Sequence, residues 1–294
     1  SVQKITPPKI DAIAVTVGPG LEPALWAGVN FARALSYIWK KPLIPVNHLE
    51  GHVYTVLLGE KPLMKRRFHQ LPMKLPAMIL IVSGGHTELV LMRKFGRYEI
   101  IGETRDDAAG EAFDKVAKML GLGYPGGPII SNFAEKFHKL MKPKAISDKL
   151  NVKLPRPMLN SNDFDFSFSG LKTAVLYLLK DLQKKHSLQE LRTPISYEFQ
   201  NAVCDVLIAK TIRAAKKYGA KSVIIGGGVA ANKLLRERLA KIIKQEAPKT
   251  SLYLPSTRFT GDNALMIALA AYFSGKKTAW NKVRALANLR LGKK

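Results

Sequence analysis

Two histidines lie four residues apart in the stretch NHLEGH, residues 47–52. If this stretch is helical, His48 and His52 share one face and both imidazoles can point at one ion. Two histidines that share a helix face without any ligand would show the same spacing. A zinc-protease helix is disfavoured because it needs a glutamate directly after the first histidine, and Glu50 lies two positions after His48, roughly 200° around the helix. Two imidazoles still need a carboxylate partner, and such a ligand set suits iron, zinc or manganese.

Two glycine-rich turns are the next candidates for chemistry. VIIGGGVAAN (223–232) places three glycines between an apolar run and an expected helix. Free backbone N–H groups and the positive end of a helix dipole attract phosphate at such a junction. The alternative is a tight turn that needs positive φ angles. SGGHT (83–87) is a second glycine turn, and two such loops in one chain favour a nucleotide ligand.

Carboxylates and hydroxyls gather in two further segments. DDAAGEAFDK (106–115) carries four acidic residues, Asp106, Asp107, Glu111 and Asp114, around an expected helix start. We expect Asp107 to cap this helix, whereas Asp114 lies beyond the cap and can accept hydroxyl hydrogen bonds from a ribose or another polar substrate. DFDFSFSGLKTA (163–174) alternates aromatic and polar residues. Either it is an extended segment that ends with Ser169 as a helix cap, or it forms an aromatic and hydroxyl wall of the active cleft.

The elements that must position these residues follow an α/β pattern. Strands are expected at residues 11–17 and 42–46, in two runs within 77–94, at 98–106, and at the starts of 221–243 and 251–273. Helices are expected within 21–41, at 48–60, at roughly 108–121, 128–143, 169–185 and 195–218, and at the ends of 221–243 and 251–273. Residues 143–168 are expected to form a long ordered loop. Three consecutive strands followed by helices differ from a Rossmann pattern and indicate the start of a second lobe.

Composition narrows the choice of partner. A chain of 294 residues is long enough for two lobes. The formal net charge of +25 favours an anionic partner, with nucleic acid first. Two basic clusters could follow phosphates: Lys61, Lys65, Arg66, Arg67 and Lys74; and Lys276, Lys277, Lys282, Arg284, Arg290, Lys293 and Lys294. A lone cysteine, Cys204, and the absence of both a signal peptide and a long apolar run predict a soluble cytoplasmic protein that does not bind membranes.

The motifs together resemble a known family. NHLEGH, SGGHTEL, DDAAGEAFDK, YPGGP, FSFSGLKTA, GGGVAAN and GDNALMIA occur in the order of the TsaD family, the catalytic subunits of tRNA threonylcarbamoyladenosine synthase, formerly called O-sialoglycoprotein endopeptidases. The resemblance runs from about residue 11 to about residue 275. It implies the two-lobed α/β fold of the actin, Hsp70 and sugar-kinase superfamily. We expect a first lobe at 1–76, a second at 77–260, and a C-terminal region at 261–294 that returns to the first.

The resemblance also implies a site. The metal ligands would be His48, His52 and Asp262, and the metal a divalent cation, iron first, with zinc or manganese as alternatives. The substrate would be threonylcarbamoyl-adenylate. Its binding residues would be Val82, Ser83, Gly84, Gly85, Asp114, Gly127 and Asn232, and the GGG loop would hold the adenylate end.

The implied reaction transfers the threonylcarbamoyl group to N6 of the adenosine 3′ of the anticodon, in tRNAs that read codons beginning with A, and releases AMP. The implied partners are tRNA and, if the source is bacterial, a TsaB-like paralogue and a TsaE-like ATPase. One departure is expected to matter. Family members begin with a strand hairpin carrying a Gly-x-Glu-Thr-Ser-Cys-Asp-Glu-Thr-like stretch, which this sequence lacks, so its first lobe is expected to be incomplete at its start.

Two rival functions remain open. Metal-dependent carbamoyltransferases that act on acceptors other than tRNA share the fold and a two-histidine helix. A non-catalytic scaffold paralogue shares the fold without the metal ligands, all three of which are present here. The FSFSGLKTA and YPGGP segments and the basic charge favour the tRNA enzyme.

Overall fold

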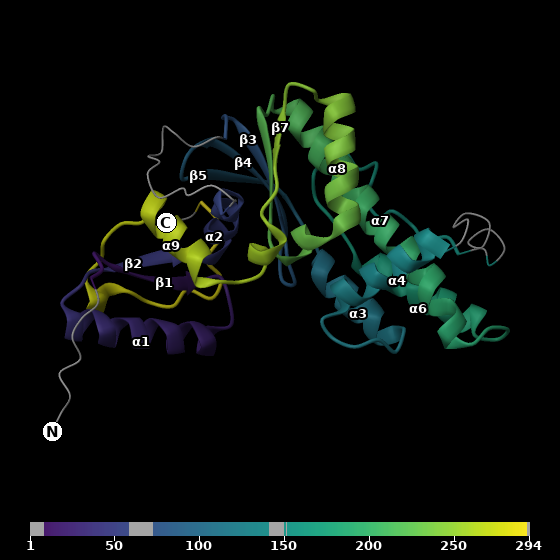
Figure 1. Cartoon of the computed structure of the whole chain (residues 1–294), viewed down its shortest axis with the longest axis horizontal. Helices are drawn as coiled ribbons and strands as arrows, with labels where there is room; N and C mark the ends of the chain where they lie inside the picture. Colours follow the sequence, from purple (N-terminus) through teal and green to yellow (C-terminus); the bar gives the residue numbers. More distant parts are fainter. Residues whose placement is uncertain (1–8, 59–72, 141–149, 151, 293–294) are drawn as a thin grey trace.

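The chain folds around two β-sheets. The computed structural model describes residues 9–58, 73–140, 150 and 152–292. Within them, the smaller sheet pairs β1 (Ile13–Gly18) in parallel with β2 (Leu43–Asn47), and the larger sheet has the strand order β5-β4-β3-β6-β7. In Figure 1 the small sheet lies at the left, the larger sheet in the middle and a group of helices at the right. The fold is thus α/β and has two parts, one on each side of the larger sheet.

The smaller sheet is covered by helices from both ends of the chain. Helix α1 (Glu22–Trp39) connects its two strands, with a proline in the first turn that fits the start of a helix. Helix α2 (His48–Tyr54) follows β2 directly. Helix α9 (Ala264–Ser274), more than 200 residues later, packs beside α2 through Leu49, Val53 and Met266. The late segment that carries Asp262 is therefore brought to the histidine helix by apolar packing.

The central strand of the larger sheet separates two hydrophobic cores. β3 (Ala77–Val82) is buried along its whole length. Alternate side chains point to opposite faces of a strand, so Leu80 and Val82 join the core on the helical side while Ile79 and Ile81 join the core beneath α2 and α9. β3 pairs with β4 (Thr87–Lys94) antiparallel and with β6 (Ser222–Gly226) in parallel. β5 (Arg97–Glu103) and β7 (Ser251–Tyr253) form the two edges. The predicted hairpin within 77–94 is confirmed.

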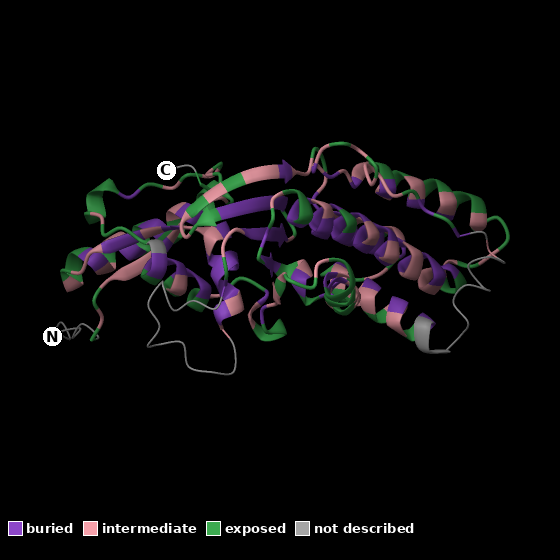
Figure 2. Ribbon diagram, turned by 90° about the horizontal axis from the view of Figure 1, so that it is seen from above, coloured by how far each residue is buried: buried purple, intermediate pink, exposed green. Residues whose placement is uncertain are grey.

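On the other face of this sheet, the described residues form five helices. They are α3 (Ala109–Met119), α4 (Gly126–Leu140), α6 (Ser169–Leu182), α7 (Leu188–Lys217) and α8 (Lys233–Glu246). Buried residues concentrate along the middle of the molecule, in the central strands and the helices beside them (Figure 2). The predicted start of α7 at residue 195 is wrong. A capping box formed by Ser187 and Glu190 begins the helix at Leu188, and Pro194 is accommodated inside it.

Two predicted helix caps, Ser169 for α6 and Asp107 for α3, are wrong. Asp106, rather than Ser169, accepts hydrogen bonds at the start of α6, from the backbone N–H groups of Phe168 and Ser169 at 2.8 and 3.2 Å. Asp107, the predicted cap of α3, instead accepts from the Lys115 ammonium at 2.7 Å. The first N–H of α3 donates to the Thr87 hydroxyl on β4. The capping groups lie 62 and 22 residues away in the sequence from the N–H groups that they bond, so neighbouring residues could not predict them.

The predicted GGG-to-helix junction is also different in detail. After β6 the chain makes a 3-10 turn at Gly228–Ala231, and α8 begins only at Lys233. The first N–H groups of α8 are capped by the Asn232 side chain, which accepts from the Leu235 N–H at 3.0 Å. The glycines therefore do not place a free helix N-terminus at the turn.

Other expectations fall partly outside the described residues. The helix expected at 48–60 ends at Tyr54, followed by a 3-10 turn, Thr55–Leu57, and its last two residues lie outside the described residues. So do Lys61, Lys65, Arg66, Arg67, Lys293 and Lys294 of the basic clusters, and most of 141–151. The rest of the expected loop is ordered by Lys210 of α7, whose buried ammonium donates to the Ser161 hydroxyl and the Asp165 carbonyl.

The C-terminal segment lies beside the smaller sheet. The Leu286 N–H donates to the Val17 carbonyl, and Thr278 bridges to Leu43. The division into 1–76, 77–260 and 261–294 stays a prediction. No helix among the described residues combines the length and the apolar character needed to cross a membrane.

Candidate metal centre

The two histidines of NHLEGH lie on the short helix α2. Asn47 begins this helix, because its side chain accepts a hydrogen bond from the Leu49 N–H at 2.9 Å. This cap fixes where the helix starts, so that His48 is its first residue and His52 its fifth. The two imidazole rings lie with centroids 4.9 Å apart in an edge-to-face arrangement. The shared face that the spacing predicted is therefore present.

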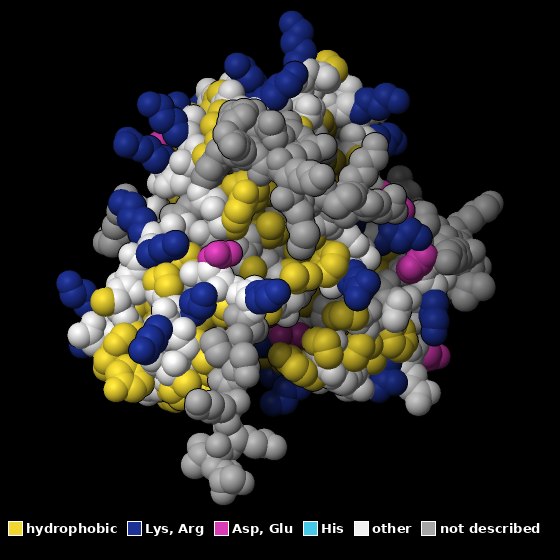
Figure 3. Space-filling view, turned by 60° about the vertical axis from the view of Figure 1, so that its left-hand side comes forward, with side chains coloured by type: hydrophobic (Ala, Val, Ile, Leu, Met, Phe, Trp, Pro, Cys, Tyr) yellow, Lys and Arg dark blue, Asp and Glu magenta, His cyan; other side chains and the backbone are white. Residues whose placement is uncertain are grey.

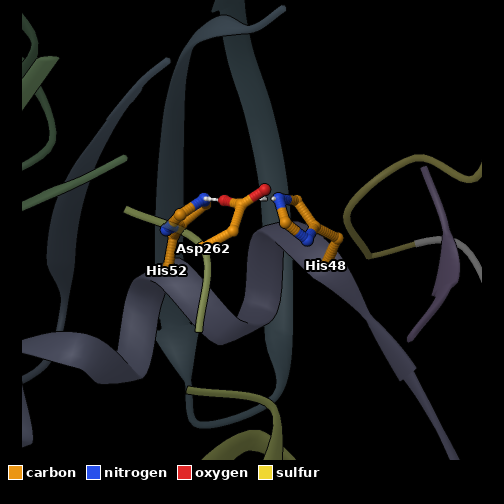
Figure 4. Close-up of side chains that lie close together, drawn as sticks. All are labelled: His48, His52 and Asp262. Carbon is orange, nitrogen blue, oxygen red and sulfur yellow. Dashed lines mark ion pairs between the residues drawn. The ribbon is translucent and has the colours of Figure 1, made fainter. Parts of the chain in front are cut away.

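Asp262 reaches this helix from the opposite end of the chain. Figure 4 shows its carboxylate between the two imidazoles. Oδ1 of Asp262 lies 3.3 Å from Nε2 of His48 and 3.3 Å from Nε2 of His52. Asn263 caps helix α9 by accepting from the Met266 N–H, so the residue just before this cap is held at the mouth of the site. One candidate ligand atom from each residue lies within 4.8 Å of the others.

The chemistry of these three side chains fits a divalent cation. Two imidazole nitrogens and one carboxylate oxygen form a ligand set used by iron, zinc and manganese. The His52 side chain is 1% exposed. Neither of its ring nitrogens makes a well-directed hydrogen bond within the described part of the chain. Burying an imidazole without partners costs free energy, and a bound cation would remove this cost at one nitrogen. The neighbouring imidazoles of His48 and His52 hold the pKa of the Asp262 carboxyl well below its ordinary value, so it is ionised and ready to bind a cation.

His48 and Asp262 line a cleft of about 1030 Å³, and His52 lies buried beside Asp262. The cleft is lined by the β3–β4 turn, the glycine turn after β6, β1, the start of α1 and the start of α9. Ser83, Gly84, Gly85 and Gly228 line it together with His48 and Asp262. Two of the predicted glycine turns therefore converge on the candidate metal ligands.

Close backbone contacts hold these turns together. A Cβ atom added to Gly226 would lie 2.7 Å from the carbonyl oxygen of His52, and one added to Gly227 would lie 2.3 Å from that of Val82. Gly227 also has a φ of +95°, a conformation that L side chains rarely adopt. These glycines are needed so that the turn after β6 can touch both the histidine helix and the end of β3.

The remaining predicted substrate residues lie elsewhere, around the first turns of α4. Asp114 accepts a hydrogen bond from the Gly126 N–H at 2.7 Å, so it caps α4, a role that the sequence analysis did not assign to it. Gly127 is the next residue of that helix. The Asn232 amide donates to Ser131 of α4 at 2.9 Å and to Gln200 of α7 at 2.8 Å. Asp114, Gly127, Asn232 and the buried Val82 are not among the residues that line the cleft.

Two residues near the site were missed by the sequence analysis. His86 lines the cleft next to the two glycines of the β3–β4 turn. Its position directly after Gly-Gly in SGGHT was an available signal. Glu88 lies two residues further along β4 and is 8% exposed, with one carboxylate oxygen buried and without a partner among the described residues. Burial, together with the nearby Glu103, raises the pKa of Glu88 to about 7. Nothing in the sequence distinguished it from an ordinary strand glutamate.

Comparison with solved structures identifies the fold. HypF from T. kodakarensis superposes with a TM-score of 0.57 at 14% identity, over 90% of this chain and 41% of that chain. Full-length HypF in a phosphate- and nucleotide-bound form gives a TM-score of 0.54 at 14% identity, over 89% of this chain and 39% of that one. At this identity the likeness concerns the fold alone. The chain has an α/β fold, as predicted.

Comparison of sequences identifies the family. The profile of TsaD, tRNA N6-adenosine threonylcarbamoyltransferase, matches residues 2–269. Curated proteins of that name are similar to this chain. The protein from Endomicrobium trichonymphae is 47% identical, over 92% of this chain and 71% of that protein. The protein from Thermomicrobium roseum is 46% identical, over 93% of this chain and 74% of that protein. The protein from Listeria monocytogenes serotype 4b strain CLIP80459 is 44% identical, over 94% and 75%. This chain belongs to the tRNA N6-adenosine threonylcarbamoyltransferase family.

Proposed function

We propose that this protein transfers the threonylcarbamoyl group of threonylcarbamoyl-adenylate to N6 of the adenosine adjacent, on the 3′ side, to the anticodon, and that AMP is released. The tRNAs concerned read codons that begin with A. The observation that carries the proposal is the cluster of His48, His52 and Asp262, of which His48 and Asp262 line a cleft together with two glycine turns, in a chain of this family.

His48, His52 and Asp262 would hold the metal. The buried His52 supports this assignment, since neither ring nitrogen makes a well-directed hydrogen bond within the described residues and Nε2 lies 3.3 Å from Asp262. A divalent cation held there would act as a Lewis acid toward the oxygens of the intermediate. Iron is our first choice, since two imidazoles, one carboxylate and open positions suit it, and zinc or manganese would bind the same donors. His52 is locked by burial, so it presents a preorganised nitrogen, and the Asn47 cap fixes the backbone of His48 at the helix start.

The glycine turns would hold the adenylate. The Ser83, Gly84 and Gly85 turn and Gly228 expose backbone at the wall of the cleft, and Gly84 and Gly85 have open space where a side chain would be. Backbone N–H groups without side chains in the way allow close approach of a phosphate. Val82 ends the buried strand that supports the turn. The role of Val82 would be to fix the position of this loop.

The cluster at α4 would bind the other polar groups of the intermediate. Asp114 uses one carboxylate oxygen for the Gly126 N–H, which leaves its second oxygen available to a ribose hydroxyl. Asn232 holds α4, α7 and α8 at fixed positions through its amide. Gly127, in the first turn of α4, leaves the helix surface open there, with no atom near the position of a Cβ. A substrate that spans both groups would reach from the metal ligands to α4.

Transfer RNA is the acceptor that the charge favours. Lys and Arg side chains are spread over the face shown in Figure 3, where few Asp and Glu appear. With a net charge of +25, the protein attracts a polyanion, and the target adenosine lies in a single-stranded loop whose bases can turn outward into a pocket. If the source is bacterial, a TsaB-like paralogue and a TsaE-like ATPase would be partners. Such an enzyme would act in the cytoplasm.

Transfer of label tests the proposal. Preformed threonylcarbamoyl-adenylate, labelled in its threonyl group, would be incubated with unmodified tRNA and the metal-loaded protein, with the two partner proteins added. We expect label on the adenosine next to the anticodon. His48→Ala should lose both the label and the bound metal, whereas His186→Ala, outside the cleft, should keep both. Label on another acceptor only would overturn the choice of tRNA, and equal transfer by His48→Ala would overturn the metal site.

A further inference from the structure

His86 occupies a fixed place in the wall of the cleft. Its backbone closes the β3–β4 turn, since the Ser83 N–H donates to the His86 carbonyl at 2.9 Å and the His86 N–H donates to the Ser83 hydroxyl at 3.2 Å. The side chain itself is only partly buried and lines the cleft. No described residue makes a hydrogen bond to its ring. The turn therefore holds an imidazole with a usable nitrogen beside the candidate metal ligands.

Among the described residues that line the cleft, His86 is the one titratable side chain that is not a candidate metal ligand. The described residues of the wall include three titratable ones, His48, Asp262 and His86, and the first two are candidate ligands. Burial lowers the pKa of His86, and the imidazoles of His48 and His52 lower it further. The ring is thus neutral near pH 7, with one nitrogen able to accept a proton. A bound cation would favour the neutral form still more.

The proposed reaction needs such a proton acceptor. When an amine attacks a carbonyl carbon it becomes positively charged, and it must lose a proton before the product is stable. A side chain that accepts this proton in the transition state accelerates such steps, typically by about 10²–10⁴-fold. His48 and His52 cannot serve while they hold a metal, because a neutral imidazole has one nitrogen electron pair and the metal would engage it.

Resting on the function proposed above, we propose that His86 is the general base that takes the proton from N6 of the target adenosine. In this step a bond forms between N6 and the carbamoyl carbon. The bond between that carbon and the phosphate oxygen breaks, and AMP leaves with the electron pair. The N6 proton passes to the free nitrogen of His86, which later releases it to water. No oxidant, reductant or further reactant is needed.

Single-turnover transfer tests this assignment in the metal-loaded protein with its partners present. His86→Ala should slow the transfer of label from preformed intermediate to tRNA by at least about 100-fold. Its metal content and its binding of the intermediate should stay close to those of the wild type. Imidazole added to the solution should restore part of the rate to His86→Ala and none to His48→Ala. The matched control, His186→Ala, should transfer at the wild-type rate.

His86→Asn separates proton transfer from hydrogen bonding. An asparagine accepts a hydrogen bond but no proton at this pH, so the variant should be as slow as His86→Ala. Wild-type rates in His86→Asn would overturn the base assignment in favour of a positioning hydrogen bond. Loss of metal from His86→Ala would overturn it in favour of a fourth ligand. No transfer by the wild-type protein itself would instead overturn the proposed function, and the base assignment with it.

Discussion

The residues at the metal site and those around the start of α4 differ in how their polar atoms are used. At the metal end, His52 is buried with both ring nitrogens lacking a well-directed hydrogen bond among the described residues, and Glu88 nearby has one oxygen buried without a partner there. At the α4 end, Asn232 is also buried, yet its amide bonds to Ser131 and Gln200 and its oxygen caps α8. Polar atoms at the metal site lack hydrogen bonds among the described residues, whereas those of Asn232 are already hydrogen-bonded within the protein.

This difference indicates which residues are available to bind a ligand and which stabilise the fold. Buried polar atoms in folded proteins are nearly always hydrogen-bonded, so an exception needs a physical reason. For His52 the proposed cation would be that reason. Asn232 needs none, because its bonds to α4, α7 and α8 account for its burial. We therefore expect substitutions at the metal end to abolish function with little loss of fold, and those at the α4 end to weaken the fold.

The largest effect is expected for His52→Ala. Removing the buried one of the two nitrogen ligands should lower metal affinity by at least about 100-fold, because loss of even a supporting residue typically costs 10–100-fold. Transfer activity should fall in parallel. Metal analysis after dialysis against a weak chelator, with His186→Ala as control, measures this. Full metal retention by His52→Ala would place the ion elsewhere.

Asn232→Ala should have the opposite profile. It removes the cap of α8 and leaves the polar atoms of Gln200 and Ser131 with fewer partners, at a combined cost of about 2–3 kcal/mol in unfolding free energy. Urea unfolding measures the loss, and the metal content of the folded fraction should stay unchanged. A variant as stable as the wild type would show that these hydrogen bonds contribute little and would blur the contrast between the two ends.

Glu88→Gln should stabilise the protein at alkaline pH. Burial raises the pKa of Glu88 to about 7 from 4.5, so the folded state holds the proton more tightly than the unfolded state. Stability from this group is therefore fully present below pH 4.5 and is lost as pH rises toward 7. At pH 8 the variant should be more stable by about 1–3 kcal/mol, and below pH 4.5 by little. Thermal unfolding at several pH values tests the sign, which a pH-independent difference would contradict.

Asp114→Asn should give the smallest change in stability. Asparagine keeps an oxygen for the Gly126 N–H, so unfolding free energy should change by less than about 1 kcal/mol. If the second oxygen binds a ribose hydroxyl, KM for the intermediate should rise several-fold while metal content is unaffected. An unchanged KM would mean that Asp114 serves α4 alone, and the α4 end would then be wholly structural.

Much of this arrangement was predictable from local patterns. Apolar runs predicted the strands, helical spacing predicted most helices, and i to i+4 spacing predicted that His48 and His52 share a face. Helix starts were the weakest point. The Ser187 capping box was a readable signal that was not used, whereas Asp106 caps a helix 62 residues away in the sequence and Thr87 one 22 residues away. Such caps depend on which strands lie beside which helices.

What the sequence determined by itself was the set of chemical groups: two imidazoles at helical spacing, glycines where backbones must approach closely, a strongly basic surface, and an ordered set of family motifs. Only the tertiary structure decided which of these groups lie close together. Asp262 reaches the histidines because α9 packs its apolar side chains against those of α2, and His86 faces the same cleft because β4 is paired with the buried strand β3. Hydrophobic burial brings apolar side chains together whatever their separation in the sequence. Local spacing could therefore predict the two ligands on α2, but it could not locate the carboxylate that completes the site.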